Sequence, residues 1–189
     1  MTNNQTTNSN SWGLRSWKTT DILTLVAIVI GLAVVSFVSS YARTVLEAAL
    51  GPFGNRIVMV VNIVILFTVP FLIRKPLAAI IGALLLGLVQ LPFSPFGLIS
   101  IVGFLVGGII TELIFAAGRY RRYGLGFLLV AGVAYNLITL AFVWVPLQIG
   151  ALGPVGLVGI FMATLIGGLL GGWITKLIGD GLIQSGVMT

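Results

Sequence analysis

The stretch VPFLIRKPLAAII, residues 69–81, places two basic residues and a proline between two long apolar runs. Charged side chains resist burial in a bilayer, and proline suits the first turn of a helix. The stretch therefore predicts a tight turn that ends one membrane-spanning helix and begins the next. The alternative is one long bent helix over 57–91, which would leave five spans and put the termini on opposite sides of the membrane.

The composition of the whole chain indicates a membrane protein. Hydrophobic residues make up 58% of the 189 residues and charged residues 7%, whereas a soluble domain has about 25% charged residues. Ten basic and four acidic side chains could not cover a water-exposed surface. The lipid bilayer is therefore the expected surrounding. Nucleic acid is not expected as a partner, because the basic residues lie between apolar runs rather than along one polar face.

Six apolar stretches predict an all-α bundle of six transmembrane helices. A span needs about 20 residues, with a range of about 17–25, so the second stretch is marginal and the third is short. The first 20 residues are polar and lack the apolar segment of a signal peptide. We expect a polar cytoplasmic tail over 1–20 and a membrane domain over 21–189. The predicted spans are 22–38, 57–73, 76–91, 98–117, 125–145 and 155–178.

The distribution of basic residues predicts the orientation of the bundle. With six spans and the N-terminus inside, eight basic residues fall in cytoplasmic segments and two in external ones, a strong bias of the kind that sets topology. Both termini are therefore expected in the cytoplasm of a multi-pass protein of the cell membrane. The inner set is Arg15, Lys18, Arg74, Lys75, Arg119, Arg121, Arg122 and Lys176, and the outer set is Arg43 and Arg56.

Several kinds of chemistry are absent from the sequence. There is no cysteine or histidine, which excludes disulfides and the common zinc sites. No phosphate-binding G-x-x-x-x-G-K-[ST] motif is present, and no two acidic residues lie close together. We therefore expect no enzyme, no catalytic residues, no metal and no cofactor.

The segment TELIFAAGRYRRYG, residues 111–124, combines an acid in an apolar run with three arginines. The simplest interpretation of the arginines is a cytoplasmic loop between the fourth and fifth helices. Glu112 and Arg119 are seven residues apart, on one face of a continuous helix. A partly buried carboxylate needs a cationic partner, so we predict a structural ion pair between them, with Arg74 or Lys75 as alternatives.

Uncharged polar and aromatic residues gather in the predicted outer half, including the loop expected over 41–56. Amides and aromatic rings converging at one membrane face are typical of a pocket for a small, flat, polar molecule. Each residue taken alone more often bonds a neighbouring helix than a ligand, and the prediction of a pocket depends on their clustering on one side. The predicted substrate-binding residues are Glu47, Asn62, Gln90, Phe93, Tyr135, Asn136, Trp144 and Gln148.

Small residues recur at four-residue spacing in two of the predicted helices. Gly167 and Gly171, and Gly168 and Gly172, follow this pattern in the last helix, and Ala27 and Gly31 follow it in the first. This spacing lets helices approach closely. It serves packing inside the bundle or a docking face for another membrane protein.

Four motifs give the chain a family resemblance: AALGPFG at 48–54, RKPLAA at 74–79, TELIFAAGRYRR at 111–122 and DGLIQSGVM at 180–188. In their order and spacing the chain resembles a substrate-binding S component of an energy-coupling factor (ECF) transporter, of the YkoE-like group associated with thiamine or its hydroxymethylpyrimidine precursor. The resemblance implies capture of a vitamin from outside and association with a transmembrane coupling protein and two cytoplasmic ATPases. It also implies docking through Ala27 and Gly31, and a lid made by the loop between the first two helices.

The ligand and the function have alternatives at this stage. Thiamine is a permanent cation and favours a carboxylate or an aromatic cage, but Glu47 is the one acid predicted outside. A neutral pyrimidine could instead be held by Gln90 and Asn136 between Trp144 and phenylalanine faces. A stand-alone channel or secondary transporter, and a scaffold without ligand, are the competing functions.

Overall fold

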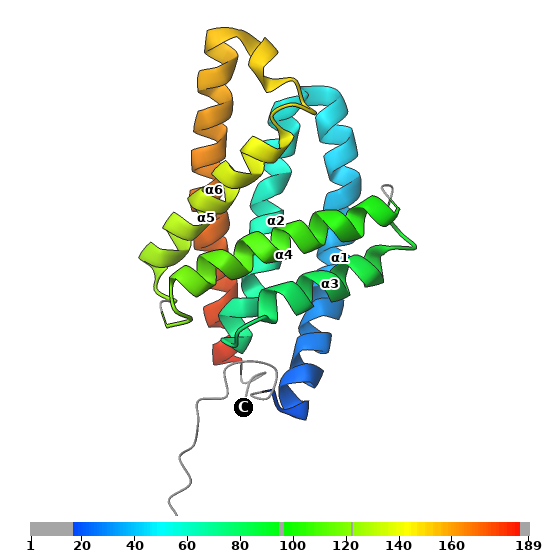
Figure 1. Ribbon diagram of the computed structural model, residues 1–189, viewed down its shortest axis with the longest axis vertical. Helices are drawn as coiled ribbons and strands as arrows, with labels where there is room; N and C mark the ends of the chain where they lie inside the picture. The colour runs from blue at the N-terminus through cyan, green and yellow to red at the C-terminus, as the bar shows by residue number, and fades with distance from the viewer. Residues whose placement is uncertain (1–16, 95–96, 122, 186–189) are drawn as a thin grey trace, which may run out of the picture.

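The computed structural model describes residues 17–94, 97–121 and 123–185 as a helical bundle (Figure 1). Residues 1–16 of the predicted tail, Arg15 among them, and Arg122 lie outside the described residues. The prediction of an all-α fold with six main helices is confirmed. The elements are α1 (Thr19–Leu50), α2 (Pro52–Ile73), α3 (Ala78–Gln90), α4 (Leu98–Ala117), α5 (Leu125–Val143), the 3₁₀ helix η2 (Ile149–Leu152) and α6 (Gly153–Gln184).

The helices of the bundle do not all run in one direction. In Figure 1 α1, α2 and α6 run along the long axis, and α3 and α4 lie side by side across them. The start of α1, the turn at 74–77, residues 118–121 and the end of α6 lie toward one end, which we call the terminal end. The α1–α2 connection and η2 lie at the other, which we call the junction end.

Five of the six helices are long and apolar enough to cross a membrane. The exception is α3, whose 13 residues extend only about 20 Å at 1.5 Å per residue, against a hydrocarbon core of about 30 Å. The prediction of six spans is therefore confirmed, in length, for five helices, and α3 is too short to cross the membrane by itself. Large apolar side chains such as Leu23, Leu98 and Val155 are exposed on the outside, as expected for helices that face lipid.

The turn at 74–77 settles the question raised by residues 69–81. Arg74 and Leu77 both adopt left-handed backbone conformations, with φ of 52° and 68°, so the chain leaves α2 and reverses before α3 begins. The single bent helix over 57–91 is therefore wrong. The chain turns here because Pro76 cannot continue the α2 hydrogen-bond ladder and the two basic side chains favour the bundle's surface.

The helix α1 is much longer than predicted. It continues past residue 38 to Leu50, and Gly51 alone separates it from α2, which starts at Pro52 rather than at residue 57. Gly51 has a φ of 57°, a value that favours glycine. The predicted loop over 41–56, and the lid assigned to it, are wrong. Its polar residues lie on two helices instead. Asn55 and Arg56 belong to the start of α2, and Arg43 and Glu47 pair across one turn of α1 at 2.7 Å.

The helix α2 is the centre of the bundle. Its residues from Ile63 to Leu72 are all buried, and its aromatic side chains pack against other helices. The Phe67 ring meets Phe115 of α4 and Tyr135 of α5 edge to face, with ring centroids 5.4 and 5.7 Å apart. Such packing stabilises helices in lipid, where the hydrophobic effect does not drive them together.

The glycines of α6 lie inside the bundle. Gly168 and Gly172 face Gly132 and Leu128 of α5 so closely that an added Cβ would meet α5 backbone atoms; at position 168 it would lie 2.6 Å from Val133 Cα. Packing inside the bundle is thus the use of these residues. Ala27 and Gly31 differ, because both are exposed on α1 and a Cβ at position 31 would meet nothing within 4 Å.

We predict that Gly168→Ala lowers the free energy of unfolding by about 1–3 kcal/mol, because the added methyl overpacks the α5–α6 contact. The measurement is the unfolding transition of the purified protein in detergent. Gly181→Ala is the matched control in the same helix, since a Cβ there has open space. Equal losses in both variants would contradict the close α5–α6 approach.

Candidate functional site

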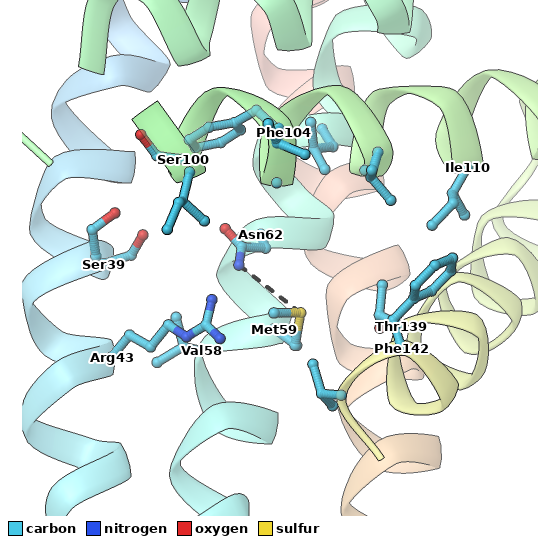
Figure 2. Close-up of a pocket in the computed structure, with 18 of the residues that line it drawn as sticks. Ser39, Arg43, Val58, Met59, Asn62, Ser100, Phe104, Ile110, Thr139 and Phe142 are labelled. Atoms are coloured by element: carbon cyan, nitrogen blue, oxygen red, sulfur yellow. Dashed lines mark hydrogen bonds between the residues drawn. The ribbon is translucent and has the colours of Figure 1, made fainter. Parts of the chain in front are cut away.

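A cavity of about 430 Å³ lies between α1, α2, α4 and α5 in the half of the bundle nearer the junction end. Its volume is in the range of small-molecule sites, about 300–1,000 Å³. Figure 2 shows Ser39 and Arg43 of α1 facing Met59 and Asn62 of α2, with α4 and α5 forming the remaining walls. Most of the lining is apolar, and a few polar groups converge on it, as is typical of a ligand site.

The polar side chains of the cavity wall differ in how many of their hydrogen-bonding groups have a partner within the protein. The hydroxyls of Ser39, Ser100 and Thr139 donate to backbone carbonyls of their own helix or turn. Among the described residues, the Asn62 amide has one hydrogen-bond partner, the Met59 sulfur at 3.9 Å, which is a weak acceptor. Its carbonyl oxygen and much of its donor capacity are therefore available to a ligand.

A glycine and several aromatic side chains shape the inner wall of the cavity. Gly107 of α4 leaves space for the Tyr135 hydroxyl, which would lie 2.9 Å from a Cβ at that position. The rings of Phe104 and Phe142 face the cavity from α4 and α5 (Figure 2). These rings and the Tyr135 hydroxyl can stack on and bond a flat heteroaromatic molecule.

A polar network leads from the cavity wall into the core. Glu47 accepts from Arg43 Nε at 2.7 Å and from Asn55 Nδ2 at 2.5 Å. Asn55 accepts from Arg56, and Arg56 donates to the backbone and side-chain oxygens of Asn136 at 3.4 and 3.3 Å. Asn136 in turn donates to Thr164 O of α6 at 2.8 Å. The network holds four helices together, although Arg56 Nε has no hydrogen-bond partner among the described residues.

Two of the eight predicted substrate residues, Asn62 and Tyr135, line the cavity. Glu47 and Asn136 are held in the polar network behind it. Gln90 is buried at the end of α3. Its Oε1 accepts from Ser40 of the wall at 3.5 Å, and its Nε2 has no partner in the part of the chain that the structure describes. None of these three lines the cavity, so their contact with a ligand stays a prediction.

The other three predicted residues lie away from the cavity. Phe93 is exposed and packs edge to face on Phe37, with centroids 5.9 Å apart. Trp144 packs on Phe161 in the cluster around η2, and Gln148 is exposed in the turn that precedes η2. The structure thus places Trp144 and Gln148 at the junction end and Phe93 in the α3–α4 connection, without bringing any of the three to the cavity.

The residues missed by the sequence reasoning come mainly from α1 and α4. The apolar pattern ends the first helix at residue 38, so it puts Arg43 in a loop and does not point to Ser39 or Ser40, although all three belong to α1. On α4 a signal was present: Ser100, Gly103 and Gly107 are small residues at helical spacing, and all three line the cavity. Small side chains on one helical face leave room beside that face.

A second polar cluster occupies the terminal end. The Glu112 carboxylate accepts the backbone N–H groups of Leu77 and Ala79 at 2.6 and 3.1 Å and the hydroxyl of Tyr120. It therefore caps the N-terminus of α3, where the helix dipole favours negative charge. The predicted pairing with Arg119 is wrong: α4 ends at Ala117, so the two residues do not share a helix.

Two tyrosines, Tyr120 and Tyr123, belong to this cluster and stay uncharged. Burial and the hydrogen bond to Glu112 raise the pKa of Tyr120, and burial raises the pKa of Tyr123 to about 12, against the opposing effect of Arg74. Both phenols stay protonated at neutral pH, so Tyr120 can donate to Glu112. The Arg74 guanidinium lies 4.9 Å from the centre of the Tyr123 ring, a cation–π distance.

Comparison with known proteins places the chain in a family. Residues 20–138 match the family model described as "ABC-type cobalt transport system, permease component". The structure matches one titled "Crystal structure of an S-component of ECF transporter" with a TM-score of 0.81 and 28% identity, over 91% of this chain and 88% of the other.

The chain is an S component of an ECF transporter.

A curated relative of this S component is known by name. It is "Putative HMP/thiamine permease protein YkoE" of Bacillus subtilis (strain 168), 29% identical over 177 residues, which cover 93% of this chain and 89% of the relative. The S component is therefore a multi-pass membrane protein and a transporter subunit, not an enzyme. The resemblance inferred from the four motifs is confirmed.

We predict that Glu112→Gln in this S component lowers the free energy of unfolding by about 1–3 kcal/mol, because hydrogen bonds to a charged acceptor are lost at a helix N-terminus. Ligand affinity should stay unchanged, since Glu112 does not line the cavity. Unfolding in detergent and ligand titration measure the two effects.

Asp180→Asn is the matched control, because Asp180 is half-exposed and pairs with Lys176 one turn away in α6. Exposed pairs of this kind contribute only about 0.3–0.5 kcal/mol. A large loss of ligand affinity in Glu112→Gln with unchanged stability would contradict the assigned capping role.

Proposed function

We propose that this S component captures thiamine or its hydroxymethylpyrimidine precursor outside the cell and delivers it to an ATP-driven ECF importer. The observation that carries the proposal is the cavity between α1, α2, α4 and α5, with its aromatic and amide lining. The name of the Bacillus subtilis relative supports the choice of ligand.

The proposed orientation puts the cavity on the outer side. Among the described basic residues, six lie at the terminal end and two, Arg43 and Arg56, at the junction end. The positive-inside bias assigns the terminal end to the cytoplasm. Both described ends of the chain then face the cytoplasm, and the cavity half faces outward.

The proposed partners are a transmembrane coupling protein and two cytoplasmic ATPases. The chain has no phosphate-binding motif of its own, so energy must come from other subunits. The α1 face around Ala27 and Gly31 is exposed and flanked by exposed Leu23 and Val34. Small residues amid exposed aliphatic ones suit close contact with another helix in the membrane.

The first test is binding and capture by the purified protein. We expect hydroxymethylpyrimidine or thiamine to bind with a dissociation constant on the order of nanomolar, and ATPase subunits to copurify from the native membrane. Binding of neither ligand would overturn the proposed substrate. Flux of either ligand through this chain alone in liposomes, without ATP, would instead support a channel or secondary transporter.

The second test separates docking from binding. Ala27→Trp and Gly31→Trp should each lower uptake by cells at least about tenfold, because a large ring prevents close helix contact, while the affinity of the purified protein stays unchanged. The control for added bulk is Val130→Trp, at an exposed position on a different helix, α5, and it should leave uptake unchanged. Loss of binding in both variants would show that these residues serve packing of the bundle.

A further inference from the structure

The acidic residues decide which charge the cavity accepts. The chain has four acids, all within the described residues, and three of them lie toward the terminal end with partners of their own. Asp21 pairs with Lys75, Asp180 pairs with Lys176 at 2.7 Å, and Glu112 caps α3. Only Glu47 lies toward the junction end.

Glu47 is not placed to receive a ligand cation. It does not line the cavity, and one of its oxygens already accepts from Arg43 and from Asn55. The nearest further charge in the network is a second cation, the buried Arg56. Two guanidinium groups and one carboxylate therefore leave this end of the bundle with a net positive charge.

The cavity wall itself carries positive charge. Figure 2 shows the Arg43 guanidinium directed into the cavity from α1, opposite Asn62 and Met59. Its Nε is directed to Glu47, at 2.7 Å. A cationic ligand in this low-dielectric space would meet a like charge and would lose its hydration without a carboxylate to replace it.

A neutral aminopyrimidine meets a suitable wall. The Asn62 amide can donate and accept on the edge of such a ring, and its sole hydrogen bond within the described chain is the weak one to Met59. The Tyr135 hydroxyl and the ring of Phe104 also line the space. Aromatic faces could attract a cation, but the Arg43 charge in the same wall opposes that attraction.

We propose that this site selects the neutral hydroxymethylpyrimidine and rejects the cationic thiamine, with Arg43 as the residue that sets this preference. The inference rests on the proposed function and narrows its substrate to one of the two ligands. It follows from the position of the charges. None of the four acids lines the cavity, whereas the Arg43 guanidinium, which is paired with Glu47, is directed into it.

The test is calorimetric titration of the full-length protein in nanodiscs with each ligand separately. We expect hydroxymethylpyrimidine to bind at least about 100-fold more tightly than thiamine. Equal affinities, or a preference for thiamine, would overturn the inference and leave the proposed function standing. Binding of neither ligand would overturn the proposed function itself.

Arg43→Gln tests the assigned residue. Removing the charge should raise thiamine affinity at least about tenfold relative to hydroxymethylpyrimidine, whereas Arg43→Lys, which keeps the charge, should preserve the preference. Both ligands are measured on the same preparation. Partial misfolding would therefore lower the binding of both ligands, and the ratio of the two affinities would stay unchanged. An unchanged ratio in Arg43→Gln would overturn the role of Arg43.

The variant Arg43→Gln with Glu47→Gln separates two effects of the substitution. In Arg43→Gln the Glu47 carboxylate loses its cationic partner and could attract thiamine, in which case the increase in thiamine affinity should be smaller in the double variant. If the increase comes only from the loss of repulsion by Arg43, it should be the same in the double variant. Lys176→Gln is the control for a cation far from the cavity and should leave the ratio unchanged. A change of the same size in Lys176→Gln would contradict a local effect of Arg43.

Discussion

A guanidinium buried among membrane helices must find its partners within the protein, because the hydrocarbon offers none. Arg56 is 1% exposed, and it meets this demand with amide oxygens from Asn55 and Asn136, while Glu47 acts on it through Asn55. These contacts fix α1, α2 and α5 relative to one another, and Asn136 adds α6. The cavity walls on α1, α2 and α5 therefore depend on how this one charge is satisfied.

Charged groups at the terminal end also find their partners within the protein. Each acid there has a hydrogen-bonded partner, and the Glu112 carboxylate on α4 caps the N-terminus of α3. Since α3 has no capping side chain of its own, a residue from the next helix ties the two together. The α3–α4 pair is thereby held across the bundle, where α4 forms a wall of the cavity (Figure 1).

Local signals were enough to predict several elements but not the lining of the cavity. The α4 bounds match the prediction because Gly97 and Gly118 flank a predominantly apolar run, and the 74–77 turn follows from its charges and proline. The end of α1 was misplaced because Arg43 and Glu47 resemble loop residues until their pairing on a helix is known. Asn136 and Trp144 could not be excluded from the site, since only the packing of α6 and η2 shows what surrounds them.

The unbroken course of α1 joins two distant places on the molecule. Gly31 on its exposed face and Arg43 in the cavity wall are 12 residues apart, about 18 Å along one rigid rod. No flexible joint lies between them, so a change in the tilt or rotation of α1 displaces both. Any partner that favours one position of α1 must therefore change the affinity of the cavity, and by thermodynamic linkage an occupied cavity changes the affinity for that partner by the same factor.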